Sequence, residues 1–193
     1  MKNFKNTLIF LGSPHKNGHT SSILKFIVSS APETNINTVE AFKENIKPCI
    51  DCYFCKKSFK CIFDDMNKIN DLIENADILI FAFPIYNSSF PAPLKSILDR
   101  MQPYYHKKFT LGIKHPVKKP KKSLILTTQG SKNIDTQEII KFQLNPILKL
   151  LNASECEYLC VKSTDDLDFD TEKYCEKNKN TIKKITDFLY SDL

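Results

Sequence analysis

Short apolar runs alternate with amphipathic helical patterns along the whole chain. The runs at 8–11 and 78–83 show no polar alternation, which is typical of strands buried on both faces of a parallel sheet. Further strands are predicted at 36–42, 123–128 and 155–162, and helices begin near Thr20, Asp64 and Pro91 and cover 136–151 and 169–190. The sequence therefore predicts an α/β fold, with a five-stranded parallel sheet that carries helices on both faces.

The order of the strands follows from the handedness of their connections. Right-handed crossovers between five parallel strands favour the flavodoxin-like order 2-1-3-4-5. In such a sheet, ligands bind beyond the carboxyl ends of the strands, where the strand order switches. We therefore expect a ligand site among the loops at 12–20, 84–91 and 127–131, in or beside which lie three glycines, Gly12, Gly18 and Gly130.

Length and composition limit the class of protein. The 193 residues fit one domain, 1–193. The longest apolar run is far shorter than the roughly 20 residues of a membrane helix, and the start of the chain lacks a signal-peptide pattern. The net charge is +6, but Arg100 is the single arginine among 28 basic residues, whereas nucleic-acid recognition usually depends on arginine. We expect a soluble, cytoplasmic protein that binds neither membrane nor nucleic acid.

The first loop, GSPHKNGHTS at 12–21, joins a buried strand to the N-terminus of a helix. Free backbone N–H groups and the positive end of the helix dipole favour a phosphate there. Ser13, Asn17, Thr20 and Ser21 add neutral donors. The loop matches neither GxxxxGK[ST] nor GxGxxG, so a monophosphate fits better than a pyrophosphate. An ordinary capped turn is the alternative.

The second loop, PIYNSSFP at 84–91, follows the clearest strand. It combines an aromatic side chain, small polar residues and two stiffening prolines, which suits contact with a flat ring. A loop that only packs Tyr86 and Phe90 is the alternative.

Four of the seven cysteines, Cys49, Cys52, Cys55 and Cys61, form a C-x2-C-x2-C-x5-C motif in the loop at 48–62. Such close thiolates can surround one compact inorganic centre, and the triple run is more typical of an iron–sulfur cluster than of zinc. Tetrahedral zinc and free thiols remain the alternatives. The other cysteines have no comparable spacing and are expected to pack in the interior.

Other polar residues carry weaker predictions. Asp64 and Asp65 are interpreted as the start of a helix, and the lysine-rich stretch at 114–122 as a solvated surface loop. His106 lies in a long connection at 103–120 with no identifiable partner. No Ser-His-Asp or paired-carboxylate arrangement can be argued.

Four segments together resemble a known family. These are GSPHKNGHTS, KPCIDCYFCKKSFKCIFDDM, FPIYNSSFPAPLKSILDRM and LILTTQG. They are similar to the NADPH-dependent FMN reductase group of flavodoxin-like proteins, and most similar to the iron–sulfur flavoproteins of anaerobes. The resemblance covers 7–164. In this chain Asn87-Ser88-Ser89 replaces a loop that often carries glycine.

The resemblance implies FMN and a [4Fe–4S] cluster as cofactors. Its motifs assign the FMN phosphate to Ser13, Asn17, His19, Thr20 and Ser21. They assign the isoalloxazine to Pro84, Ile85, Tyr86, Asn87, Ser88, Thr127, Thr128, Gln129 and Gly130. The cluster would be held by Cys49, Cys52, Cys55 and Cys61. Members of the family are usually dimers or pairs of dimers, so a homodimer or homotetramer is expected.

The expected function is an oxidoreductase in which electrons pass between FMN and the cluster, with NAD(P)H or ferredoxin as the electron donor. The cofactors carry the chemistry, so no catalytic side chain is predicted. An NAD(P)H-dependent FMN or quinone reductase without a cluster is one alternative. A thiol- or metal-sensing module is the other.

Overall fold

The computed structural model describes residues 4–132 and 135–192 and contains one five-stranded parallel sheet. The strands are β1 (Asn6–Leu11), β2 (Asn35–Glu40), β3 (Ile78–Pro84), β4 (Lys122–Thr128) and β5 (Glu155–Val161). Their order is β2-β1-β3-β4-β5, and every pairing is parallel. The predicted flavodoxin-like architecture is therefore confirmed.

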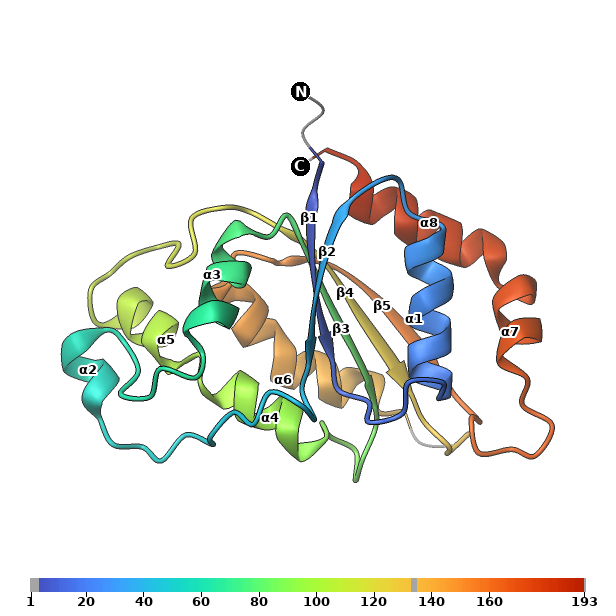
Figure 1. Ribbon diagram of the computed structural model, residues 1–193, viewed down its shortest axis with the longest axis horizontal. Helices are drawn as coiled ribbons and strands as arrows, with labels where there is room; N and C mark the ends of the chain where they lie inside the picture. Colours follow the sequence, from blue (N-terminus) through green and yellow to red (C-terminus); the bar gives the residue numbers. More distant parts are fainter. Residues whose placement is uncertain (1–3, 133–134, 193) are drawn as a thin grey trace.

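Helices cover both faces of the sheet (Figure 1). One face packs against α1 (His19–Ser29), α7 (Thr171–Lys177) and α8 (Lys179–Tyr190). The other face packs against α3 (Asn67–Asn75), α4 (Ala92–Asp99) and α6 (Gln137–Leu150). None of the helices among the described residues is long and apolar enough to cross a membrane.

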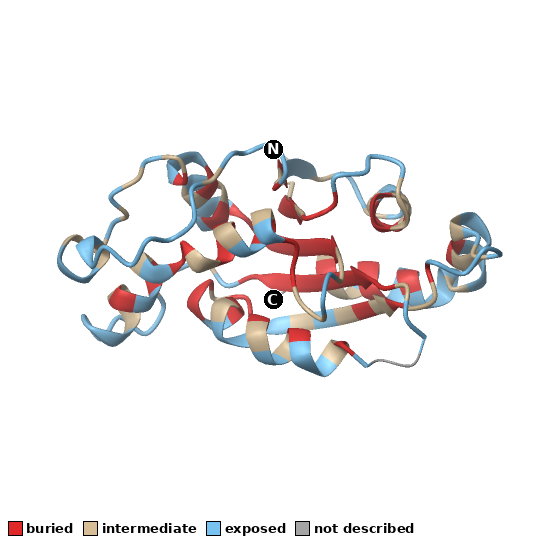
Figure 2. Ribbon diagram, turned by 90° about the horizontal axis from the view of Figure 1, so that it is seen from below, coloured by how far each residue is buried: buried red, intermediate tan, exposed pale blue. Residues whose placement is uncertain are grey.

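The central strands supply both halves of the core. In β3, Leu79 and Phe81 pack on the α3–α4–α6 side, whereas Ile78 and Ile80 pack on the α1–α8 side. Phe81 stacks on Phe10 of β1 with ring centroids 4.9 Å apart. Figure 2 shows the buried strands between the two helix layers. Burial on both faces explains why these strands read as uninterrupted apolar runs.

Helix boundaries differ from the sequence prediction in three places. The connection predicted at 103–120 contains α5 (Gln102–Phe109), which has Pro103 in its first turn and buries Tyr104 and His106. The cysteine loop contains a short helix, α2 (Phe54–Ser58). The single closing helix predicted at 169–190 is two helices that meet at Asn178. Helix α5 packs against elements distant in the sequence, and the periodicity of the local sequence does not indicate such packing.

The lysine-rich stretch at 114–122 is only partly exposed to solvent. The prediction of a solvated surface loop is therefore wrong for its last two residues. Lys121 is 1% exposed and Lys122 is 4% exposed. The Lys121 ammonium donates to the carbonyl oxygen of Ala76 at 2.8 Å and to that of Lys119 at 3.1 Å. Backbone carbonyls thus take the place of water around the Lys121 charge.

Substitution of Lys121 by methionine tests this burial through its pH dependence. Burial, with a smaller contribution from Lys119, lowers the pKa of Lys121 to about 8 from 10.5. Between these pH values the unfolded chain retains the proton that the folded chain has lost, so this group stabilises the fold increasingly as pH rises. The unfolding free energy of the wild type, relative to Lys121→Met, should therefore rise by about 3 kcal/mol across this range.

Urea unfolding at several pH values measures this difference. Lys118→Met is the matched control, since Lys118 is an exposed lysine three residues away. An identical pH dependence in the wild type and in Lys121→Met would contradict the account of the buried ammonium.

Candidate cofactor sites

The three predicted ligand loops meet at the carboxyl edge of the sheet. The Gly12 amide donates to the carbonyl oxygen of Ala82 at 2.8 Å, which ties the first loop to β3. The Ile85 amide donates to the carbonyl oxygen of Thr128 at 2.8 Å, which ties the second loop to β4. The hydroxyls of Thr20 and Thr128 lie 2.6 Å apart. The loops therefore form one connected edge, at the switch between β1 and β3.

The first loop is closed on itself before the start of α1. The Ser21 hydroxyl donates to the carbonyl oxygen of His15 at 2.7 Å, and Ser13 Oγ accepts from the His15 amide at 3.3 Å. Gly18 is the N-cap residue of α1, and no side chain caps the helix. The amides of the first turn thus keep their capacity to bind an anion, which fits the phosphate of a flavin mononucleotide.

The five predicted phosphate contacts differ in their surroundings. Ser13, Thr20 and Ser21 are buried, whereas Asn17 is exposed, 3.4 Å from the Lys25 ammonium. His19 Nδ1 lies 2.6 Å from the hydroxyl of Thr171 on α7, and this contact ties its ring to the start of that helix.

The second loop is a tight turn that begins at Tyr86 and ends at Ser89. Tyr86 and Ser89 exchange two backbone hydrogen bonds of 3.0 and 2.9 Å. Between them, Asn87 and Ser88 have φ values of 49° and 59°, so both lie in the left-handed region that favours glycine. The Tyr86 side chain is exposed and free to contact a ligand.

The third loop leaves β4 at Thr128 and is packed closely. Thr127, Thr128 and Gln129 are buried. The Gln129 side chain donates to the carbonyl oxygen of Ser131 at 2.7 Å and accepts from the Thr136 hydroxyl. A Cβ on Gly130 would lie 2.0 Å from a carboxylate oxygen of Asp165, so a larger residue there would have to displace this exposed side chain.

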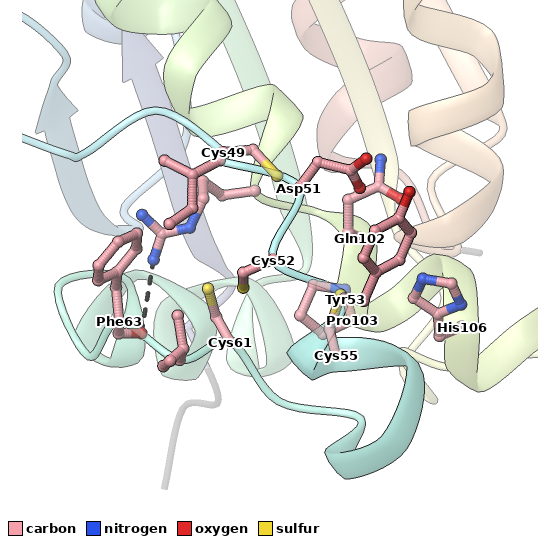
Figure 3. A pocket seen from close by; sticks show the side chains of 13 residues that line it. Cys49, Asp51, Cys52, Tyr53, Cys55, Cys61, Phe63, Gln102, Pro103 and His106 are labelled. Atoms are coloured by element: carbon pink, nitrogen blue, oxygen red, sulfur yellow. Dashed lines mark hydrogen bonds between the residues drawn. The ribbon is translucent and has the colours of Figure 1, made fainter.

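All four cysteines of the motif line one pocket (Figure 3). The pocket lies between the segment that follows β2 and the start of α5, and its other lining residues are Ile50, Asp51, Tyr53, Ile62, Phe63, Arg100, Gln102, Pro103 and His106. Burial, together with the charges of the other three cysteines, raises the pKa of the Cys55 thiol. Within residues 4–132 and 135–192, no three His, Cys, Asp or Glu side chains form a group that could hold a metal ion.

The backbone of the cysteine segment is strained. Asp51, Tyr53 and Phe59 have φ values of 49°, 58° and 56°. Left-handed conformations are costly for residues other than glycine and need support from the surrounding structure. Here they flank Cys52 and Cys55 and turn the chain around the pocket.

An ion pair between buried Arg100 and half-buried Asp65 fixes this segment to the rest of the fold. The Arg100 guanidinium, at the end of α4, contacts the Asp65 carboxylate at 2.5 Å and donates to the carbonyl oxygen of Lys47 at 2.7 Å. It also lies over the Phe63 ring, 5.1 Å from its centroid. Burial raises the pKa of Asp65, but the hydrogen bonds from Arg100 and the Lys47 amide outweigh it and hold that pKa below its ordinary value.

Sequence analysis missed Arg100 and His106, and misassigned Asp65. Helix α3 begins at Asn67 without a side-chain cap, so Asp65 serves the ion pair and not the helix start. One sequence feature could have indicated a special role for Arg100: it is the only arginine in a chain rich in lysine. A planar fork binds a carboxylate and a carbonyl together, which lysine cannot do in the same geometry.

The chemistry of the cysteine pocket fits a thiolate-ligated iron–sulfur centre. Its sulfur atoms are soft donors, and its walls combine apolar groups such as Ile62 and Pro103 with the Arg100 cation. Thiolate-ligated clusters are negatively charged overall, so an apolar wall with one buried cation suits them.

Comparison with known proteins gives one family and several relatives. A family model described as NADPH-dependent FMN reductase matches residues 6–133. An iron-sulfur flavoprotein of Methanosarcina thermophila is 31% identical over 133 residues, 67% of this chain and 66% of that protein. Another, of Methanocaldococcus jannaschii, is 33% identical over 95 residues, 48% of this chain and 49% of that protein. The chain thus spans between about half and two thirds of the length of these relatives.

A solved structure shares the fold over the full length. The NAD(P)H:quinone oxidoreductase from Methanothermobacter marburgensis superimposes with a TM-score of 0.75 at 16% identity, covering 99% of this chain and 98% of that one.

Glycine at position 88 should stabilise the second loop. Ser88 has φ 59° in a two-residue turn, and an Asn-Gly pair is the favoured sequence for such a turn. Ser88→Gly should raise the unfolding free energy by roughly 0.5–1 kcal/mol. Ser89→Gly is the control and should lower it, because Ser89 is not in the left-handed region and its hydroxyl donates to the side chain of Gln143. Urea unfolding of both variants measures these changes in the unfolding free energy. Destabilisation by Ser88→Gly would contradict the turn geometry.

Proposed function

The chain belongs to the NADPH-dependent FMN reductase family, and on this premise we propose that it is an FMN-dependent oxidoreductase that passes electrons between FMN and a [4Fe–4S] cluster. The cluster ligands are Cys49, Cys52, Cys55 and Cys61. The observation that carries the proposal is the arrangement of these four side chains around one pocket beside a buried cation. FMN exchanges electron pairs or single electrons, and an iron–sulfur cluster exchanges single electrons.

The protein's own contribution is to bind and orient the cofactors. The amides of the first turn of α1 bind the FMN phosphate, supported by Ser13, Asn17, His19, Thr20 and Ser21. The second and third loops line the isoalloxazine through Pro84, Ile85, Tyr86, Asn87, Ser88, Thr127, Thr128, Gln129 and Gly130. The hydrogen bonds between loops support this proposal, because they hold all three segments together at one edge.

The names of the sequence relatives also support a cluster. Both of the relatives described above, at 31% and 33% identity, carry the name iron-sulfur flavoprotein. The segment KPCIDCYFCKKSFKC contains the four cysteines within the region matched by the family model. A zinc ion is the chemical rival, since four thiolates also suit tetrahedral zinc.

A second candidate function is an NAD(P)H-dependent FMN or quinone reductase without a cluster. The description of the matched family favours it, because that description specifies a nicotinamide donor and no metal. Steady NADPH oxidation by a preparation with flavin but no iron would support this candidate. Electron transfer only from reduced ferredoxin would count against it. The homodimer or homotetramer expected from the family resemblance stays a prediction.

Removal of one cysteine of the motif should abolish cluster binding but not FMN binding. Anaerobically reconstituted wild type should contain about four iron and four sulfide per chain, together with FMN. Cys52→Ala should lose most of the iron and the broad visible absorbance while keeping FMN, because the flavin loops do not involve this side chain. Iron, sulfide and flavin analysis, together with the absorbance spectrum, measures each effect.

Cys156→Ala is the matched control, since Cys156 lies on β5 outside the pocket. It should keep all three components. Wild-type iron content in Cys52→Ala, or unchanged electron transfer from flavin to acceptor in Cys52→Ala/Cys55→Ala, would contradict the proposal.

A further inference from the structure

Arg100 has one donor that the protein itself does not use. Its Nη1 donates to Lys47 O and to the Asp65 carboxylate at 2.7 and 3.3 Å, and its Nη2 donates to the Asp65 carboxylate and to Phe63 O at 2.5 and 3.4 Å. Among the described residues, its Nε is the buried side-chain nitrogen or oxygen without a hydrogen-bond partner. The residue is only 3% exposed. A buried donor without an acceptor is costly and calls for an explanation.

The unused donor belongs to a side chain that lines the cysteine pocket. Arg100 is among the lining residues together with Cys61, and Cys61 interacts electrostatically with the guanidinium. Phe63, two residues after Cys61, is held by Arg100 through both its carbonyl oxygen and its ring. In Figure 3 the sulfur atoms of Cys52 and Cys61 point into the same space. The guanidinium therefore contacts Asp65 through Nη1 and Nη2 and lies beside Cys61 in the wall of the cysteine pocket.

We propose that Arg100 is a positioning residue whose Nε–H donates a hydrogen bond to the sulfur of Cys61 when that sulfur ligates the cluster. The inference rests on the proposed function, because the acceptor is a cluster ligand. Hydrogen bonds to ligand sulfur stabilise the more negative, reduced state and so raise the reduction potential. This role requires arginine: Nη1 and Nη2 anchor the loop while Nε remains available, and a lysine ammonium cannot divide its donors in this planar way.

The wild-type protein offers a direct test, because Arg100 is the only arginine. Protein labelled with nitrogen-15 gives a single arginine Nε–H resonance, which needs no assignment. We expect this resonance to shift strongly and to exchange more slowly with solvent when the iron-free protein is reconstituted with iron and sulfide. A resonance that is unchanged in protein shown to contain a full cluster would overturn the inference.

Three variants separate hydrogen bonding from charge and from anchoring. Arg100→Lys keeps the charge but removes the Nε–H donor, so the cluster should have a lower reduction potential and lose iron to a chelator several-fold faster. Asp65→Asn keeps an oxygen acceptor for Arg100 but removes a negative charge beside it, so the potential should not fall. Lys47→Gln removes an exposed positive charge near the Phe63 ring and should have no effect.

Redox titration of the reconstituted proteins decides between these roles. A wild-type potential in Arg100→Lys would overturn the inference, as would an equal fall in Asp65→Asn, which would indicate anchoring alone. Wild-type protein that takes up FMN but no iron would instead defeat the proposed function, and this inference with it. Full iron content with an unaffected Nε–H resonance would defeat the inference only.

Discussion

The parallel sheet, buried on both faces, is the constraint on which the rest of the structure depends. Parallel strands place all their carboxyl ends at one edge, and β1 lies between β2 and β3, so the chain must cross over β1 to reach β3. The loops after β1, β3 and β4 therefore lie together at the switch point of the sheet. The same crossover carries the cysteine segment to the α3–α4 side of the sheet (Figure 1). The sheet topology therefore sets the position of the flavin edge directly, and that of the cysteine segment through the connection from β2 to β3.

The two sites are stabilised by different physical means. The flavin edge is held by backbone and hydroxyl hydrogen bonds between neighbouring loops, so little rearrangement is needed for a ligand. The cysteine segment is less buried: Ile50 and Ile62 are 60% and 53% exposed, and its short helix buries no residue. Arg100 attaches both ends of this segment through the carbonyl oxygens of Lys47 and Phe63. Asp65, which is only partly buried, holds the guanidinium in place for these contacts. A bound inorganic centre would add the missing interior to this segment.

Much of the architecture could be predicted from the sequence, because doubly buried strands leave a clear apolar signal. Strands β1 and β3 could be predicted from local apolar runs. The positions of the three ligand loops could be predicted from these strands and from the handedness of the crossovers. Helix α5 could not be predicted in this way, since Tyr104 and His106 are buried by distant elements. The partnership of Arg100 with Asp65 spans 35 residues and leaves no local trace, as does the burial of Lys121. The assignments of side chains to FMN stay predictions.

A crystal structure of the anaerobically prepared protein, with anomalous diffraction collected at the iron absorption edge, tests the central claim most directly. The account predicts anomalous density inside the pocket lined by Cys49, Cys52, Cys55 and Cys61, and a flavin against the loops after β1, β3 and β4. Iron bound elsewhere, or a flavin at the sheet edge with a single zinc ion or no metal among the four cysteines, would contradict it.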